Sequence, residues 1–258
     1  MNIRLIAVAM LLLFSFAFGT AETALAADPA GGIGIPGIDV NIGTSNNPAD
    51  VSSSINLILL ITLLSLAPAI LIMMTCFTRI VIVLSFVRTS LATQQMPPNQ
   101  VLIGLALFIT LFVMSPVIGQ VNEEAYKPYM RGEITQTEAI SKASVPIKKF
   151  MAAQTREKDL QLFLNYTGTA KPQTVEEIPL TVLVPAFAIS EIKTAFQMGF
   201  MIFIPFLVID MVVASTLMAM GMMMLPPVMI SLPFKILLFI LVDGWYLVVK
   251  SLLFSFNT

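Results

Sequence analysis

Residues 196–227 read FQMGFMIFIPFLVIDMVVASTLMAMGMMMLPP, and this stretch decides the class of fold. Up to Met224 it carries a single charged residue, Asp210. A helix needs about 20 predominantly apolar residues to cross a bilayer, and this run is long enough. Pro226 and Pro227 then end the helix, because proline lacks the backbone N–H that a helix interior requires. The stretch therefore predicts a membrane helix followed by a loop.

The composition of the whole chain agrees with a membrane protein. Of its 258 residues, 57% are hydrophobic and only 11% are charged, which is unusual for a soluble domain. The net charge of -1 gives no basic excess to neutralise phosphates, so nucleic-acid binding is not expected. The chain has no histidine and one cysteine, Cys76, which excludes a Ser-His-Asp triad, a Cys-His pair and Cys/His zinc sites within it. No cofactor or metal is expected.

The N-terminal residues 1–26 predict a cleavable signal peptide. Arg4 precedes a short apolar core, and Ala24 and Ala26 fit a small-x-small cleavage site. The alternative is an uncleaved first membrane helix, but the apolar run of about 14 residues is short for one. Residues 27–53 are rich in Gly, Pro, Ser and Asn and predict a flexible extracytoplasmic tail.

Four hydrophobic segments follow, which predict an all-α membrane protein. They lie at residues 54–74, 101–118, 196–224 and 228–254. They group into a first helical hairpin, residues 54–120, and a second, residues 180–258. Arg79 and Arg88 lie between the first two segments, so the positive-inside rule places that connection in the cytoplasm.

Residues 121–179 form a polar region between the two hairpins, expected outside the cytoplasm. It holds eight of the 14 Lys and Arg residues and eight of the 15 Asp and Glu residues. Thr137 or Thr135 is expected to cap a helix that Pro146 interrupts. The apolar face consists of Ile147, Phe150, Met151, Leu160, Phe163 and Leu164. This face is expected to pack a small helical hairpin or, alternatively, to contact another subunit.

Three charged residues in the second hairpin are candidate site residues, because charges in apolar segments need partners. Glu191 and Lys193 are two positions apart and point to different sides of a helix, so a partner on another subunit is expected. Lys193 could equally reach water by snorkelling. Asp210 suits either a proton relay or a hydrogen bond to a neighbouring helix, and the second is favoured because few titratable groups lie nearby. Small residues that allow close helix contact, and hence oligomerisation, are Ala195, Gly199, Ala214, Ala219 and Gly221.

The stretches PAFAISEIKTAFQMGF and FIPFLVIDMVVASTLMAMGMMMLPP closely resemble the FliP family of flagellar proteins, which includes the SctR counterparts in virulence type III secretion. The resemblance extends through LAPAILIMMTCFTRIVIVLSFVR, PPNQVLIGLALFITLFVMSPVI and LPFKILLFILVDGW, and covers nearly everything after residue 54. It implies a core subunit of the flagellar type III protein export gate, in the bacterial cytoplasmic membrane at the basal body. It also implies that the hydrophobic segments are bent helical hairpins, partly outside the membrane.

The implied partners are further FliP copies, FliQ, FliR, other membrane proteins of the export apparatus and unfolded flagellar export substrates. The resemblance further implies that Met222, Met223 and Met224 form a deformable apolar gasket around the pore. On composition alone, these methionines would be lipid-facing or core filler. The residues expected to break the helix into a loop are Gly221, Pro226 and Pro227.

Two other functions compete with the export gate, which would have no enzymatic activity. The first is an ion- or proton-coupled small-solute transporter subunit that uses Asp210, Glu191 and Lys193. The second is an intramembrane hydrolase, but Asp210 and Asp243 stand in unlike contexts and form no recognisable catalytic pair.

Overall fold

The structure, a computed structural model, describes residues 48–93, 96–168, 172–222 and 224–256. The predicted signal peptide and most of the predicted tail lie outside these residues. The chain divides into two units, residues 1–63 and 64–258, and in the first only the beginning of helix α2 is described. The regular elements of the described residues are all helical, as predicted.

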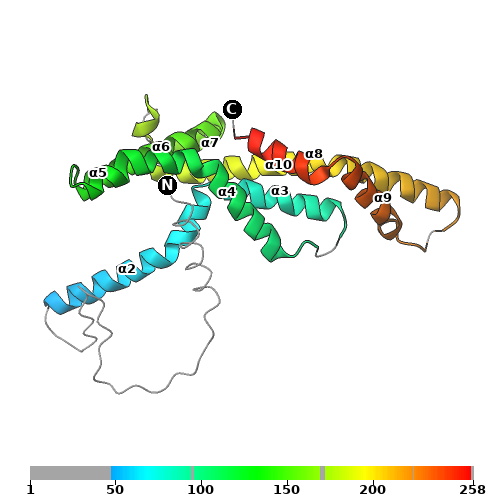
Figure 1. Cartoon of the computed structure of the whole chain (residues 1–258), viewed down its shortest axis with the longest axis horizontal. Helices are drawn as coiled ribbons and strands as arrows, with labels where there is room; N and C mark the ends of the chain where they lie inside the picture. Colours follow the sequence, from blue (N-terminus) through cyan, green and yellow to red (C-terminus); the bar gives the residue numbers. More distant parts are fainter. Residues whose placement is uncertain (1–47, 94–95, 169–171, 223, 257–258) are drawn as a thin grey trace, which may run out of the picture. The chain divides into compact units, whose positions relative to one another are not determined.

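Figure 1 shows the order of these helices along the chain. The elements are α2 Pro48–Met73, α3 Phe77–Ser90, α4 Asn99–Val121, η1 Asn122–Tyr126, α5 Lys127–Met130, α6 Gln136–Gln154, α7 Glu157–Thr167, η2 Val175–Glu177, α8 Leu180–Ala219, α9 Pro227–Leu241 and α10 Gly244–Phe254. Of the two short elements, η1 is a π-helical turn that joins α4 to α5, and η2 is a 3₁₀ turn.

Two helices in the described residues are long and apolar enough to cross a membrane. One runs from Asn99 to Met130 through α4, η1 and α5, and the other is α8. Helices α9 and α10 are bent by 62° relative to each other. If this pair counts as one span, the described residues contain up to three spans. α2 carries a shorter apolar stretch, Ile58–Ile70, so the count of four segments stays a prediction.

Helix α8 begins well before the pass expected at residues 196–224. Its 40 residues span about 60 Å at ~1.5 Å per residue, about twice the thickness of a bilayer core. It includes Pro185 and Pro205 without a break. Only part of α8 can therefore lie within the hydrocarbon of one membrane.

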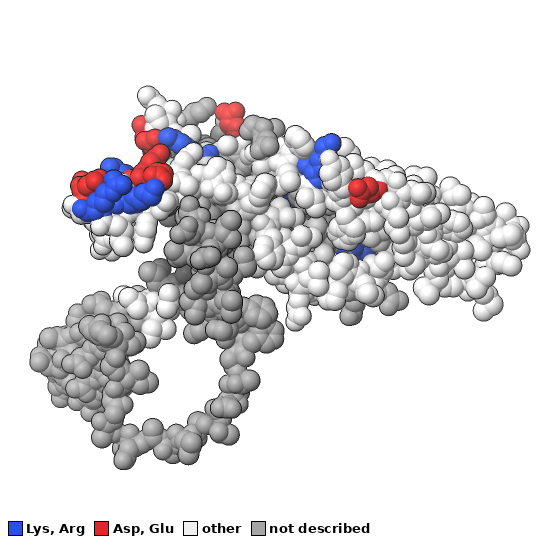
Figure 2. Space-filling model, viewed as in Figure 1, with Lys and Arg blue, Asp and Glu red and all other residues white. Residues whose placement is uncertain are grey.

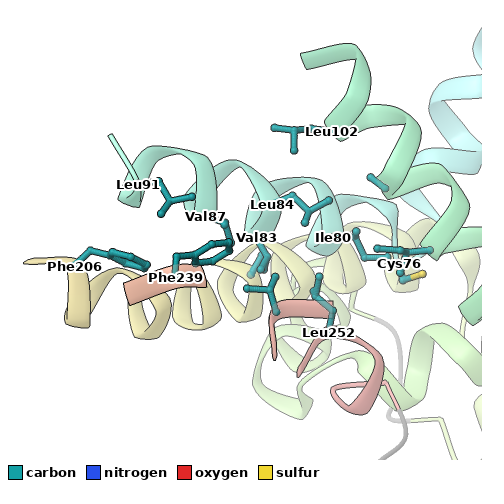
Figure 3. Packing of buried hydrophobic residues seen from close by; sticks show 14 of the residues in the cluster. Cys76, Ile80, Val83, Leu84, Val87, Leu91, Leu102, Phe206, Phe239 and Leu252 are labelled. Atoms are coloured by element: carbon teal, nitrogen blue, oxygen red, sulfur yellow. The ribbon is translucent and has the colours of Figure 1, made fainter. Parts of the chain in front are cut away.

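The main core forms where α3 packs against α4 and α8 (Figure 3). The buried residues of α3 recur at helical spacing on one face, which is the pattern of a helix buried along one side. They are Ile80, Val83, Leu84 and Val87, flanked by Cys76 and Leu91. Phe206 of α8, Phe239 of α9 and Leu252 of α10 complete this core.

A close contact between α3 and α8 depends on small residues of α8. The rings of Phe86 and Phe196 meet edge to face with centroids 5.3 Å apart. A Cβ added at Gly199 would collide with the ring of Phe86, and Ala195 is fully buried. Gly199 and Ala195, expected to allow close helix contact, thus do so within the chain.

The polar region packs against the first part of α8. Met151 of α6 joins Leu183 and Phe187 of α8 in a second buried cluster, and Leu160 of α7 packs on it. Both α6 and α7 contact α8. The apolar face of the polar region therefore packs against α8 of the same chain, and not only within a hairpin of α6 and α7. Figure 2 shows acidic and basic side chains gathered where α5 lies, whereas the visible surface over α9 is almost free of them.

Helix α6 tests two expectations about the polar region. Its N-cap is Thr135, whose hydroxyl accepts the Glu138 N–H while the Glu138 carboxylate accepts the Thr135 N–H. The prediction of Thr135 as a cap is confirmed. The predicted interruption at Pro146 is wrong, because α6 continues through it to Gln154. The apolar contacts beyond Pro146 hold the helix together despite the missing backbone hydrogen bond.

Candidate functional site

A buried ion pair joins the motif around Glu191 to helix α3. Glu191 is 0% exposed and Arg79 is 2% exposed. The Nε of Arg79 donates to Oε2 of Glu191 at 2.9 Å, and Nη2 donates to Oε1. This is a bidentate pair, the geometry in which guanidinium and carboxylate groups interact most strongly.

The remaining donors of Arg79 are also satisfied. Nη2 donates to Oε1 of Gln154 at 2.9 Å, and Nη1 donates to the backbone oxygen and Oγ of Ser255 at 3.0 and 3.1 Å. The guanidinium carbon lies 4.2 Å from the centroid of the Phe256 ring. All five N–H donors of the guanidinium therefore have an acceptor. We call Arg79, Glu191, Gln154, Ser255 and Phe256 the Arg79 cluster; it joins α3, α6 and α8 to the residues after α10.

The Arg79 cluster differs from two expectations drawn from the sequence. Glu191 was expected to find its partner on another subunit, and the structure supplies that partner within the chain. Arg79 was counted as a loop charge for the positive-inside rule, yet it is buried and neutralised by Glu191. In the connection between the first two hydrophobic segments, the positive-inside rule then depends on Arg88 alone. The assignment of Glu191 to a subunit interface stays a prediction.

The neighbouring residue, Ser190, belongs to a second polar cluster, which joins α8 to Arg156 and Asp159. Its hydroxyl donates to Oδ2 of Asp159 at 2.6 Å and accepts the Arg156 backbone N–H at 3.1 Å. Arg156 Nη2 also donates to Oδ2 of Asp159, at 2.5 Å. Burial acts to raise the pKa of Asp159, but the hydrogen bonds from Ser190 and Arg156 outweigh it and leave that pKa below its ordinary value.

Lys193 contributes to the same electrostatic environment. It is exposed on α8, and its positive charge helps to lower the pKa of Asp159. Exposure is what either snorkelling or a contact with another subunit requires. The interface role of Lys193 stays a prediction.

Asp210 forms a third polar cluster, between α8 and α9. It accepts hydrogen bonds from Oγ of Ser231 at 2.5 Å and from Nζ of Lys235 at 2.6 Å. The side chain of Lys235 is only 3% exposed. The favoured interpretation of Asp210, a hydrogen bond to a neighbouring helix, matches this geometry, and the neighbour belongs to the same chain. The predicted interface role of Asp210 stays a prediction.

The sequence indicates Glu191, Asp210 and Lys235 as charges that need partners, but it does not predict that Glu191 pairs with Arg79 and Asp210 with Lys235. Arg79 and Lys235 each stand alone in an apolar stretch, TCFTRIVIV and LPFKILLF. A buried charge needs a partner of opposite sign. This requirement could have suggested that the two isolated basic residues pair with the two isolated acidic residues, Glu191 and Asp210. Gln154, Ser190, Ser231 and Ser255 give no comparable signal, because such residues are common on helix surfaces.

The loop between α8 and α9, residues 220–226, has well-defined ends, and we call it the methionine loop. Gly221 takes a left-handed conformation with φ 74°, which glycine adopts without strain. Its N–H donates to the Met218 oxygen at 3.0 Å, and the Met222 N–H donates to the Leu217 oxygen at 2.9 Å. This is a Schellman motif, which satisfies the last carbonyls of α8. α9 then starts at Pro227, with Pro226 as its N-cap.

Two described methionine side chains of this loop, Met222 and Met224, are exposed. Met224 is 99% exposed and Met222 is 48% exposed. Met223 lies outside the described residues. The hinge residues Gly221, Pro226 and Pro227 stand where α8 ends and α9 begins, whereas a gasket role of the methionines stays a prediction.

Large apolar side chains are also exposed along α8 and α9 on both sides of the loop. They include Phe200, Met201, Val208, Met211, Met229, Phe234 and Leu237. Exposed apolar surface of this extent marks contact with lipid or with other proteins. The described residues contain no group of three or more His, Cys, Asp or Glu side chains placed to hold a metal. The site thus consists of ion pairs that fix the helices and an apolar loop.

Residues 60–252 match the model of the FliP family. The chain belongs to the FliP family. A flagellar biosynthetic protein FliP of Bacillus subtilis is 69% identical over 217 residues, which cover 84% of this chain and 98% of that protein. FliP of Pectobacterium carotovorum is 53% identical over 222 residues, 86% of each chain. FliP of Aquifex aeolicus is 49% identical over 225 residues, 86% of this chain and 92% of the relative.

Membership in the FliP family makes the chain a flagellar biosynthesis and export protein with helices that can span a membrane. The matched range includes the methionine loop, the Asp210 cluster and the pair of Arg79 and Glu191. Ser255 and Phe256 of the Arg79 cluster lie beyond it.

Proposed function

We propose that the chain is a core subunit of the flagellar type III protein export gate. With further FliP copies, FliQ and FliR it would form the channel through which flagellar proteins leave the cell, at the basal body in the cytoplasmic membrane. Other membrane proteins of the export apparatus and unfolded substrates are its further partners. The family match supports the flagellar export role, and the geometry of the α8–α9 hairpin supports the channel.

The observation that carries the proposal is the methionine loop at the turn of this hairpin. A ring of copies would bring several such loops together at the centre of the channel. Methionine has three rotatable bonds and a polarizable sulfur, so its side chains repack around irregular shapes at little cost. Met222, Met223 and Met224 would close the resting channel against ions and yield to an unfolded polypeptide. Pro226 and Pro227 would keep the loop outside the helices.

The exposed apolar surface supports assembly with other subunits. α8 is too long for a single straight pass, which favours helical hairpins that lie partly outside the bilayer. The apolar faces of α8 and α9 would then be covered by lipid at some levels and by neighbouring subunits at others. In this assembly Lys193 is exposed to meet a neighbour, while Glu191 and Asp210 would shape the interface by holding the helices that form it.

The competing proposal of a small-solute transporter is less well supported. A proton-relay carboxylate must gain and lose its proton during each cycle. Asp210 instead accepts hydrogen bonds from the buried Lys235 and from Ser231, so both of its carboxylate oxygens are occupied by side chains of the neighbouring helix α9. Glu191 is enclosed by the Arg79 cluster and has no exposed surface.

The proposal is tested by cross-linking a substrate that has stalled in the gate. A photoreactive amino acid, p-benzoylphenylalanine, replaces Met224 in motile cells, and a flagellar substrate fused to a tightly folded domain blocks the channel. We expect covalent cross-links between position 224 and the substrate. The control places the same amino acid at Tyr129, which is exposed in the polar region. A stalled substrate that cross-links at 129 but never at 224 would contradict the proposal.

A further inference from the structure

We propose that Ser255 and Phe256 form a latch that closes on Arg79 and holds the last turn of α10 in place. The latch fixes the α9–α10 pair at its far end, whereas the methionine loop lies at its beginning. Both residues lie beyond the range 60–252 that matches the family model. The latch itself depends only on the contacts of these residues, and its effect on the gate rests on the proposed export function.

Helix α10 buries only a narrow face. Its buried residues, Gly244, Val248 and Leu252, recur every four positions and form one stripe along the helix. Leu252 reaches the main core beside α3 (Figure 3). A helix that buries one residue per turn depends strongly on the contacts at its two ends.

The start of α10 is held by an aromatic corner. α10 is bent by 62° from α9, and Asp243 between them takes a left-handed conformation with φ 50°, so the two helices are separate segments. The ring of Phe239 meets Trp245 edge to face with centroids 5.4 Å apart. The same ring occupies the space that a Cβ at Gly244 would need. These contacts fix the first turn of α10 and leave its last turn to a second contact.

That second contact is a cap supplied by another helix. Nη1 of Arg79 donates to the backbone oxygen of Ser255 at 3.0 Å and to its Oγ at 3.1 Å. This Oγ in turn donates to the backbone oxygen of Leu252 at 2.7 Å. The last carbonyls of a helix lack partners within it, and positive charge is favourable there because of the helix dipole. Arg79 of α3 therefore caps the C-terminal end of α10.

Phe256 closes this cap. The guanidinium carbon of Arg79 lies 4.2 Å from the centroid of the Phe256 ring, within the range of a cation–π contact. Such a contact is stronger where water is excluded, and Arg79 is buried. Without the ring, Arg79 would still donate to Glu191 and Gln154. The latch can therefore open while the buried ion pair stays closed.

The latch would position the methionine loop through the two helices between them. The pair of Lys235 and Asp210 joins α9 to α8 at one level, and a helix held at one level can still turn about that contact. An open latch would release the last turn of α10, and α9 would shift with α10 because the aromatic corner connects them. The loop at the start of α9 would then lose its fixed position.

The latch is tested by hydrogen exchange of the full-length chain purified in detergent. Phe256→Leu keeps an apolar side chain but removes the π face, whereas Phe256→Trp keeps a π face. We expect exchange in α10 to become about 5- to 30-fold faster with leucine, as for the loss of a cation–π contact, and to stay at the wild-type rate with tryptophan. Unchanged exchange in α7 would show that both variants are folded.

The matched control for this test is Phe254→Ala. The Phe254 ring lies 6.0 Å from Nζ of Lys250 and takes no part in the Arg79 cluster, so its loss should leave exchange at the end of α10 near the wild-type rate. Equal protection of α10 in Phe256→Leu and the wild type would overturn the latch, because the ring would then act by its volume alone.

The effect on the gate is tested in cells with the same two variants of Phe256. Motility and ion leak are measured where co-purification shows that the gate has assembled. We expect the leucine variant to swim poorly or leak and the tryptophan variant to behave as the wild type. A loosened α10 with normal motility and no leak would overturn the positioning of the loop. The cross-link from position 224 tests the export function separately: its failure, with the exchange result intact, would contradict that function and leave the latch.

Discussion

Replacement of Glu191 by alanine gives the sharpest test of the Arg79 cluster. Among the residues that the structure describes, Glu191 is the one carboxylate that pairs with Arg79, so the substitution leaves the buried guanidinium without a counterion there. Two of its N–H donors, at Nε and Nη2, lose their acceptors, while the N–H groups that donate to Gln154 and Ser255 keep theirs. The helices α3 and α8 then lose their polar connection.

The size of the effect follows from these two donors. A buried donor without an acceptor costs about 1–3 kcal/mol, so two cost about 2–6 kcal/mol. Breaking a buried ion pair by removing one partner typically costs about 3–5 kcal/mol, which lies within the same range. At about 2–4 °C per kcal/mol for a chain of this size, the unfolding midpoint should fall by about 6–20 °C.

The assay is thermal unfolding of the purified protein in detergent, followed by far-UV circular dichroism. Glu176 provides the matched control, because it pairs with Lys149 at 3.4 Å while both side chains are exposed. Replacing Glu176 by alanine should cost less than about 1 kcal/mol. A double variant, Arg79→Met with Glu191→Leu, should recover most of the lost stability, because well-packed apolar residues can replace a buried pair.

One result would refute this reasoning. If Glu191→Ala unfolds at the wild-type temperature but fails to assemble with other subunits, the carboxylate acts across an interface, as the sequence alone suggested. The double variant would then also fail to assemble. The internal ion pair would be a minor contribution to the fold.

Three further predictions concern other contacts of α8 and its loop. Gly199→Val should displace the Phe86 ring from α8 and lower the free energy of unfolding by about 1–3 kcal/mol. Gly104→Val should not have this effect, because there is open space around Gly104. Equal thermal unfolding midpoints for the two variants would contradict this prediction. The pKa of Asp159 in the folded state is lowered from its ordinary value of 3.8. The hydrogen bonds of the carboxylate should therefore stabilise α7 fully above pH 3.8, and this stabilisation should be lost as the pH falls through the folded-state pKa. Hydrogen exchange of α7 should therefore rise at low pH in the wild type relative to Asp159→Asn, and parallel curves would show that the carboxylate is not responsible. Gly221→Ala should cost about 1–2 kcal/mol because φ is 74°, and should loosen the end of α8 in hydrogen exchange; unchanged protection would exclude strain at this position.

Local signals in the sequence predicted local structure well. The apolar runs predicted the helical class, and Thr135, one of the two caps expected from the sequence, is the N-cap of α6. Gly221 and the two prolines gave the break between α8 and α9. Each of these features depends on residues within one or two helical turns, so the sequence contains the whole cause.

Features that depend on distant residues could not be predicted in this way. The partner of Arg79 lies 112 positions away, and the positive-inside rule treats every Arg between two apolar segments as a loop charge. Pro146 reads as a helix breaker, but contacts with α8 outweigh its missing hydrogen bond. The apolar pass predicted at residues 196–224 overlaps the second part of a longer helix, because α8 already starts at Leu180 and continues through the buried Glu191.

The central claim, that the methionine loop closes an export channel, is tested most directly by measuring ion leak and motility in the same cells. The comparison is between the wild type and a variant with Met222, Met223 and Met224 replaced by alanine, with assembly verified by co-purification of the gate. We predict that the variant assembles and leaks ions, because alanine is too small to fill the centre of the ring. A variant that assembles, stays tight and swims normally would contradict the claim.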